Sequence, residues 1–327
     1  MSKHSIKIII CTIFALLAFA GNSVLCRMAL GENTIDAASF TVIRLISAIV
    51  ILFVFLLLEK VFKKQTEASN PQVSISKLST SKGSWFAASL LFIYAVTFSY
   101  GYVSLDTGVG ALILFGAVQI TMVVAGLISG NKLHYSEWLG LLIAFAGFVY
   151  LVIPSLTSPS LTGFILMTVS GIAWGLYTLI GRHSKQAIND TAYNFLRTTP
   201  FVFVLIFAVF AVVPSTPDFS VGSATDMQSN NAFYLTVEGV MLAVLSGAIA
   251  SGLGYAVWYI AIAGLSVTQA AVVQLFVPVV AAVGGVIFTS EVITLRLVES
   301  SVLVLGGIFI VIFGRQYFSS ASRKQTN

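Results

Sequence analysis

The segment FTVIRLISAIVILFVFLLL, residues 40 to 58, carries a single charged side chain, Arg44, in an otherwise apolar run. A helix of this length spans the hydrocarbon core of a bilayer. An arginine inside such a helix raises the free energy of insertion by about 2.5 to 3.5 kcal/mol. The segment therefore predicts a transmembrane helix in which Arg44 faces protein or water rather than lipid.

The composition of the whole chain predicts the same kind of protein. Of its 327 residues, 57% are hydrophobic and 9% are charged, and the mean hydropathy is +0.98. Soluble domains are about 25% charged. Apolar runs of about 20 residues are typical of transmembrane helices and not of a membrane barrel, whose strands are shorter and alternate. We therefore expect an all-α, polytopic membrane protein with the lipid bilayer as its partner.

Hydropathy predicts ten transmembrane helices separated by mostly short loops. The predicted ranges are 6 to 29, 36 to 58, 85 to 104, 107 to 129, 137 to 153, 162 to 181, 191 to 213, 235 to 262, 266 to 288 and 295 to 317. Two loops, 59 to 84 and 214 to 234, are long and polar. A cleaved signal peptide ending near Ala20 is the alternative for the first range, but that apolar run continues to Leu30 at full spanning length.

The positive charges predict the orientation. With ten spans, one side of the membrane collects Lys3, Lys7, Lys60, Lys63, Lys64, Lys77, Lys82, Lys132, Arg182, Lys185, Arg315, Arg323 and Lys324, and the other side has only Arg296. Lysine and arginine favour the cytoplasmic side. Both termini should therefore be cytoplasmic. The positive residues that give the net charge of +5 are explained by their place on the cytoplasmic side, so we expect no nucleic-acid partner.

The two halves of the chain resemble each other. At a constant offset of 159, residues 100 to 151 match 259 to 310 without a gap, including Gly126 with Gly285 and Gly147 with Gly306. A fainter match sets Arg44 opposite Arg197. Five helices per copy is an odd number, so the second copy enters the membrane upside down, as in many secondary transporters. We expect repeats at residues 1 to 156 and 157 to 327.

Several motifs resemble a known family. The segment GLGYAVWYIAIAGLSVTQAAVVQLFVPVVAAVGGVIFTSEVITL, residues 252 to 295, is similar to the EamA family of the drug/metabolite transporter superfamily. The resemblance rests on a Gly-rich aromatic helix, a helix with Pro278, and Glu291 just after it, and it extends to residues 20 to 30 and 170 to 182. It implies a ten-helix carrier of the bacterial inner membrane, commonly an exporter of amino acids or related metabolites.

The chain departs from that family at three positions. Ala20 stands where a Trp is common, Arg27 replaces the usual Lys, and Gln119 replaces an expected Pro. The substrate class therefore does not transfer directly from the resemblance.

Polar and aromatic side chains at mid-depth in the predicted spans are the candidate substrate-binding residues, because lipid cannot satisfy them. They are Asn22, Arg44, Trp174, Tyr177, Arg197, Trp258, Tyr259, Gln269 and Gln274. Pro278 is a candidate hinge and Glu299 a candidate for coupling to protons. The alternative for the arginines is that they extend to the membrane interface. Replacement of Arg44 by Ala is expected to abolish transport but not insertion.

These patterns predict a secondary-active transporter of small-molecule metabolites that works by alternating access. A passive facilitator or channel is the alternative. The chain has no GxxxxGK[ST] phosphate loop, and His4, His134 and His183 lack the spacing of metal ligands. Cys11 and Cys26 fall about 22 Å apart on one helix, too far for a disulfide. We expect no enzyme activity, cofactor or metal, and a monomer.

Overall fold

The computed structural model describes residues 3–69, 82–128, 130, 135–153, 159–182, 184, 186–212, 234–265 and 267–324. Within these ranges the chain is helical, and its β-type pairing is an isolated bridge between Ile35 and Leu235. The all-α prediction is confirmed. The loop expected at 59 to 84 is wrong at its start, because residues 59–69 are polar but continue the helix of the preceding apolar run; residues 70–81 lie outside the described residues. The loop expected at 214 to 234 lies outside them except for Tyr234, as does the expected repeat boundary at 156 and 157.

The first half of the chain forms five uninterrupted helices: α1 (Lys3–Gly31), α2 (Ala37–Ser69), α3 (Trp85–Tyr102), α4 (Thr107–Ile128) and α5 (Tyr135–Val152). In the second half, α6 (Leu161–Gly181) and α13 (Leu295–Lys324) are continuous. The other predicted ranges hold interrupted helices: α7 (Ala187–Arg197) with α8 (Thr199–Val212); α9 (Val237–Leu245) with the π-helix η2 (Ser246–Leu253) and α10 (Gly254–Ala263); and α11 (Val267–Gln274) with α12 (Phe276–Thr289).

In the part of the chain that the structure describes, seven helical stretches are long and apolar enough to cross a membrane. They are Ser5–Gly31, Ala37–Val61, Trp85–Tyr102, Thr107–Ile128, Leu161–Gly181, Ala187–Val209 and Val237–Ala263. Large apolar side chains such as Ile10, Leu57 and Phe207 are exposed on their outer faces, where lipid would cover them. The chain is an integral membrane protein.

Proline accounts for two of the interruptions. Pro200 has no N–H for the carbonyl of Leu196, and the hydroxyl of Thr199 donates to that carbonyl at 2.7 Å instead. Pro278 likewise has no donor for the carbonyl of Gln274, and the helix is interrupted at Leu275. Prolines are tolerated in membrane helices when other groups satisfy the freed carbonyl.

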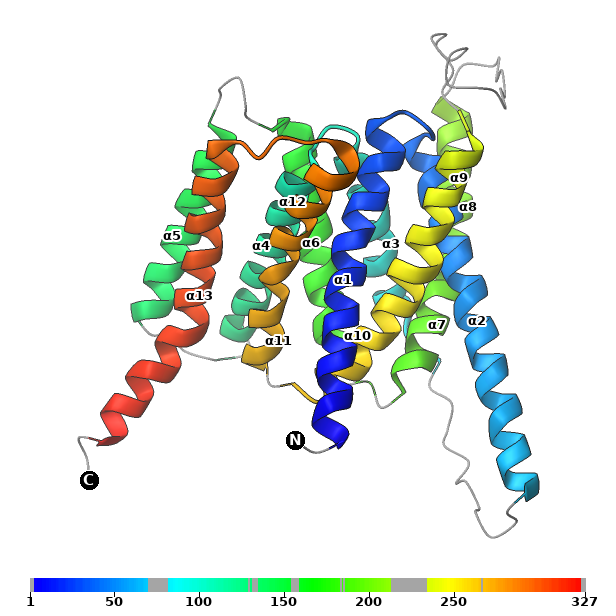
Figure 1. The fold of residues 1–327 in the computed structure, drawn as a ribbon, viewed down its shortest axis with the longest axis horizontal. Helices are drawn as coiled ribbons and strands as arrows, with labels where there is room; N and C mark the ends of the chain where they lie inside the picture. Colours follow the sequence, from blue (N-terminus) through cyan, green and yellow to red (C-terminus); the bar gives the residue numbers. More distant parts are fainter. Residues whose placement is uncertain are drawn as a thin grey trace.

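The helices run side by side in one bundle (Figure 1). The first turn of α1 and the last turn of α13 lie at the same end, here called the terminal end; the end that carries the connection from α1 to α2 is called the distal end (Figure 1). Helix α5 packs along α13, α6 packs against α3 and α4, and α1 lies against η2, α10 and α12. This arrangement surrounds the middle of α1 with the helices that carry most of the candidate residues.

Candidate functional site

Arg44 lies about two turns from the start of α2, and its side chain is buried in the bundle. Its Nε donates a hydrogen bond to the hydroxyl of Ser251 at 3.0 Å. Its Nη2 donates to the hydroxyls of Tyr94 at 3.1 Å and Tyr255 at 2.9 Å, while its Nη1 has no hydrogen-bond partner. Arg44 therefore faces protein rather than lipid.

The charge of Arg44 has no anionic partner. Among the described residues Arg27 pairs with Asp106 and Glu291, whereas Arg44 forms no ion pair. The ring centroids of Phe98 and Tyr94 lie 4.7 and 5.2 Å from the Arg44 Cζ atom. Hydroxyl dipoles and ring faces offset part of the desolvation penalty of a buried cation, which is several kcal/mol. The site thus holds an uncompensated positive charge that an anion would stabilise.

Asn22 extends this network from α2 and α3 to α1. Its Nδ2 donates to the hydroxyl of Tyr94 at 3.2 Å, and its Oδ1 accepts from the hydroxyl of Ser246 at 2.6 Å. The hydroxyls of Tyr94 and Tyr255 lie 2.8 Å apart and form a further hydrogen bond. Four segments, α1, α2, α3 and the interrupted helix containing η2, therefore meet through one set of buried polar groups.

The π-helix η2 is the element that brings the serines to this network. It carries both Ser246, bound to Asn22, and Ser251, bound to Arg44. The contact requires a glycine, because a Cβ added at Gly247 would lie 2.1 Å from the backbone oxygen of Arg44. π-helical turns inside α-helices occur frequently at functional sites.

Aromatic rings form a wall beside the network. The ring centroid of Trp174 on α6 lies 4.4 Å from that of Tyr255, 5.0 Å from Tyr94 and 5.5 Å from Phe19. Trp258 also lies 5.5 Å from Phe19. The indole Nε1 atoms of both tryptophans are buried and have no hydrogen-bond partner. The wall therefore offers flat apolar surface together with unused hydrogen-bond donors.

A second aromatic layer separates this wall from the terminal end. The rings of Tyr177 and Tyr259 stack with centroids 5.6 Å apart, and Tyr177 lies 5.6 Å from Trp174. The amide of Asn194 donates to the Tyr177 hydroxyl at 3.5 Å. Beyond the layer is a cavity of about 190 Å³ whose lining includes polar side chains of Asn194, Tyr259 and Asp190. Tyr259 thus belongs both to this layer and to the lining of the cavity.

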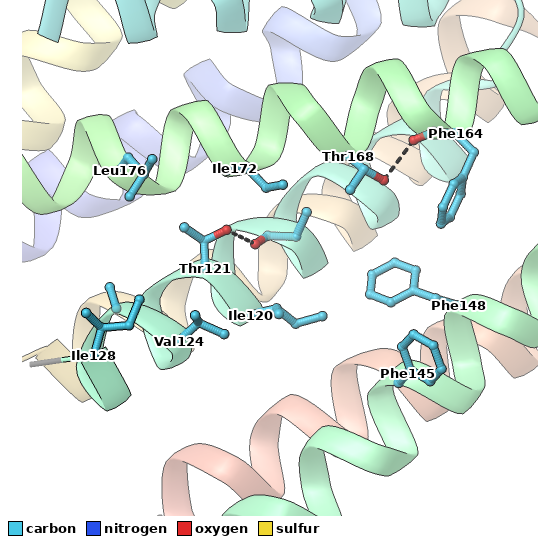
Figure 2. A pocket seen from close by; sticks show the side chains of 12 residues that line it. Ile120, Thr121, Val124, Ile128, Phe145, Phe148, Phe164, Thr168, Ile172 and Leu176 are labelled. Atoms are coloured by element: carbon cyan, nitrogen blue, oxygen red, sulfur yellow. Dashed lines mark hydrogen bonds between the residues drawn. The ribbon is translucent and has the colours of Figure 1, made fainter. Parts of the chain in front are cut away.

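A larger cavity lies elsewhere, between α4, α5 and α6 (Figure 2). It has a volume of about 540 Å³ and an almost wholly apolar lining that includes Phe145, Phe148 and Ile172. Its two threonine hydroxyls, of Thr121 and Thr168, donate to backbone carbonyls of their own helices (Figure 2). Without free polar groups it offers nothing to recognise a charged metabolite, so the Arg44 cluster is the better candidate site.

The structure places five of the other predicted site residues near Arg44 and leaves the rest elsewhere. Asn22, Trp174, Tyr177, Trp258 and Tyr259 are buried around it in the two layers described above. The Nη1 of Arg197 instead donates to the carbonyl of Lys82, and its Cζ lies 5.5 Å from the ring centroid of Trp85. Lys82 precedes α3 and Trp85 is its first residue, whereas Arg44 contacts Tyr94 further along that helix. The two arginines therefore do not share a contact.

The remaining candidates lie on the α11, α12 and α13 segments. Gln269 is exposed, whereas Gln274 is buried and donates to the carbonyl of Ala270 at 3.1 Å. Pro278 is buried in α12. Glu299 is exposed and accepts a hydrogen bond from the hydroxyl of Tyr150 at 2.5 Å, on the side of the bundle formed by α5 and α13.

Tyr255, Ser246 and Ser251 are site residues that the sequence prediction missed. Tyr255 lies four residues before Tyr259, so helical spacing places it on the same face as a predicted site residue and could have identified it. The two serines had no such signal, because they are five residues apart and meet their partners through the π-helical turn.

Comparisons with known proteins identify the family. A family model described as "EamA-like transporter family" matches residues 161–313. An uncharacterized protein of Pseudomonas aeruginosa is 42% identical over 94% of this chain and 96% of its own length. This chain belongs to the EamA-like transporter family. The resemblance noted in the sequence is confirmed.

More distant relatives of this EamA-like protein carry functional names. Proteins of Salmonella typhimurium and Escherichia coli, each named "Probable amino-acid metabolite efflux pump", are 20% and 22% identical. They match 69% and 70% of this chain, and the chain covers 77% and 78% of their lengths. One solved crystal structure has the same fold, with a TM-score of 0.56 and 15% identity over 90% of this chain and 94% of that one.

Two residues of the EamA-like motifs meet near the distal end. Glu291 accepts from the Nε of Arg27 at 3.2 Å and from the backbone N–H of Thr107, the first residue of α4, at 2.9 Å. A carboxylate at a helix N-terminus satisfies free donors and complements the helix dipole. Asp106 also pairs with Arg27 at 3.2 Å but is 55% exposed. Glu291 thus joins α1, α4 and the connection after α12.

Glu291→Gln is expected to lower the free energy of unfolding of this EamA-like protein by about 1 to 2 kcal/mol, because the amide keeps the shape but loses the charge-assisted bonds. Asp106→Asn is the matched control, since it removes the exposed charge facing the same arginine and should change stability by less than about 0.5 kcal/mol. Denaturation of both variants in detergent measures the difference. Equal effects would contradict the role of Glu291 as a cap.

Proposed function

We propose that this chain is a secondary-active transporter of small organic metabolites in a bacterial inner membrane, working by alternating access as an exporter of amino acids or related amphipathic solutes. The functional names of its distant relatives support the direction and the solute class. The proposed transport unit is a monomer.

The buried Arg44 without a carboxylate partner carries this proposal. Charged residues within membrane helices are rare and mark substrate or ion pathways. A buried cation without a counter-charge destabilises the packed bundle. We infer that it is retained because it binds a ligand. The guanidinium has one nitrogen, Nη1, without a partner, and it is suited to bind a carboxylate with two parallel hydrogen bonds. Arg44 is the proposed anchor of the substrate.

The pattern of helix contacts supports ten spans in two inverted repeats. In such a pair α1 corresponds to α6, α3 to the helix containing η2 and α10, α4 to α11 and α12, and α5 to α13. When each helix is replaced by its equivalent in the other repeat, the contact between α3 and α6 becomes a contact between α10 and α1, which the structure also has. In the same way, the contact between α4 and α6 becomes the observed contact between α12 and α1. The contacts of α5 with α13 and of α4 with α12 each join two equivalent helices, so the exchange leaves them unchanged. This is the pairing expected of two copies related by a two-fold axis.

The closed state of the site supports alternating access. Arg44, Trp174 and Trp258 are all buried, so a solute reaches them only after the helices move. The Tyr177 and Tyr259 layer lies between the Arg44 cluster and the cavity at the terminal end. The interrupted helices, including the one with Pro278, supply positions where such motion can occur.

A panel of metabolites tested with inside-out membrane vesicles, with and without a proton gradient, tests the proposed function. Export predicts saturable accumulation inside these vesicles and acceleration of labelled flux by unlabelled solute on the far side. Flux that does not saturate and shows no such acceleration would favour the passive facilitator. Dependence on the gradient would establish coupling to protons.

We also propose that the terminal end is cytoplasmic. The test uses single cysteines in a background with Cys11 and Cys26 replaced by serine: Ser5→Cys at the terminal end and Glu32→Cys at the distal end, both at exposed positions. In intact cells a membrane-impermeant maleimide should label position 32 only, and position 5 should react after permeabilisation. The reverse pattern would overturn the proposed orientation.

A further inference from the structure

We propose that the preferred solute is an organic monocarboxylate with an apolar or aromatic body and no ammonium group. This inference rests on the proposed function, since it concerns the solute that the Arg44 cluster binds. Of the proposed class, amino acids or related amphipathic solutes, it selects related solutes that carry a carboxylate alone over the amino acids themselves.

Three polar groups beside the expected position of the solute are unused hydrogen-bond donors. The Nη1 of Arg44 and the indole Nε1 atoms of Trp174 and Trp258 are buried and have no partner. These groups donate hydrogen bonds and cannot accept them. The hydroxyl oxygens of Tyr94, Tyr255 and Ser251 already accept from Arg44. A ligand that completes this set must bring acceptors, and a carboxylate brings two oxygens that only accept.

No carboxylate of the described residues pairs with Arg44, where the carboxylate of a solute would bind. The helices α1, α3, α6 and α10 and the π-helix η2 contain no Asp or Glu. The nearest acid along this segment is Asp36, which directly precedes α2 and lies eight residues before Arg44, about 12 Å at the rise of an α-helix. Asp36 is buried, and its Oδ1 accepts a hydrogen bond from the backbone N–H of Ser39. An amino acid would therefore place a second cation beside the guanidinium without a counter-charge, and such a buried pair is unfavourable.

Aromatic rings do not remove this conflict. Ring faces attract cations, but the faces of Tyr94 and Phe98 nearest the site already lie over the Arg44 guanidinium. The rings of Trp174, Tyr255 and Phe19, with centroids 4.4 to 5.8 Å apart, instead offer a surface against which a flat apolar group can pack. The carboxylate and the body of the solute are thus both recognised, and the ammonium is not.

The anion would replace hydrogen bonds that Arg44 makes to neighbouring side chains. The Nη2 of Arg44 divides its hydrogen bonds between two neutral tyrosine hydroxyls, which also bind each other at 2.8 Å. Release of these hydroxyls from Arg44 leaves them paired with each other, so a carboxylate can take over the guanidinium without leaving the hydroxyls unsatisfied. The tyrosines therefore act as replaceable partners of Arg44.

Three ligands with the same phenyl ring test the inference: phenylpropanoate has only the carboxylate, phenylalanine has both charges, and phenethylamine has only the ammonium. Calorimetric titration of the purified full-length protein should show phenylpropanoate binding at least about tenfold more tightly than phenylalanine, with no binding of phenethylamine. Arg44→Gln should weaken phenylpropanoate binding by at least about tenfold. Lys60→Gln, which removes an exposed cation from the same helix, should not change it.

The outcomes separate this inference from the proposed function. The inference would be overturned if phenylalanine bound as tightly as phenylpropanoate or more tightly. It would also be overturned if phenylpropanoate did not bind. In either case the metabolite panel in vesicles would still decide whether the chain is a transporter. Phenylpropanoate binding that is unchanged in Arg44→Gln would also overturn it, because the acid would then be held elsewhere. If that variant does not fold, the ranking of the three ligands on the wild-type protein decides.

Discussion

Arg44→Met is expected to abolish transport and to leave the protein as stable as the wild type or more stable. The apolar side chain has a similar length but offers no donor to a carboxylate, so transport should fall by at least about 100-fold, the loss expected for two charge-assisted hydrogen bonds. Replacement of buried charges by apolar residues of similar volume is often neutral or stabilising, by about 1 to 4 kcal/mol. Arg44→Ala should abolish transport as well.

Vesicle transport and thermal unfolding in detergent, measured on the same preparation, check both halves of this prediction. Lys60→Met is the matched control, because it removes an exposed cation from the same helix and should leave transport unchanged. Unchanged transport by Arg44→Met would mean that the arginine is a structural residue. Lost transport together with a large loss of stability would mean that its hydrogen bonds to Tyr94, Tyr255 and Ser251 hold the bundle together.

The sequence predicts most of this fold because lipid imposes a strong pattern. Each predicted apolar range coincides with a helix or an interrupted helix, since backbone groups in a bilayer must bond within their own segment. Much of the site was also predictable, because Asn22, Arg44, Trp174 and Trp258 are polar or aromatic groups at mid-depth that need partners from protein.

The sequence does not distinguish Arg44 from Arg197. Both follow the start of an apolar segment by a few residues, and they align in the repeat. Their environments differ because α2 is continuous past Arg44, whereas α7 ends at Arg197, where Pro200 interrupts the helix. Arg197 therefore reaches the carbonyl of Lys82 and the ring of Trp85 instead of the bundle interior.

The π-helical turn of η2 was also not predictable. Ser246, Gly247 and Ser251 give no periodic signal in a segment that is apolar almost all round. The turn is stabilised by its partners on other helices, Asn22 and Arg44, which lie more than 200 residues earlier in the chain. Tertiary contacts of this kind determine the position of the serines and therefore the shape of the site.

Gly247→Ala is expected to have the largest effect on stability among single glycine substitutions in the site. Its Cβ would lie 2.0 Å from the Ser47 Oγ and 2.1 Å from the backbone oxygen of Arg44. The Ser47 side chain can rotate away, but the backbone of α2 cannot, so η2 and α2 must separate. We expect a loss of about 1 to 3 kcal/mol in the free energy of unfolding, as for other overpacked interiors.

The same separation should also reduce transport, because η2 carries Ser251 and leads into α10 with Tyr255, and both residues position the Arg44 side chain. Gly306→Ala is the matched control: no atom lies within 4 Å of its added Cβ, so stability should be unchanged or slightly greater. Gly252→Ala should fall between the two, since its closest neighbour is a side-chain methyl of Ile51 at 2.8 Å. Thermal unfolding and vesicle transport should therefore rank the three variants in the same order, with Gly247→Ala the most impaired and Gly306→Ala the least. A stable and active Gly247→Ala protein would mean that the close approach of η2 to α2 is not needed to hold Arg44 in place.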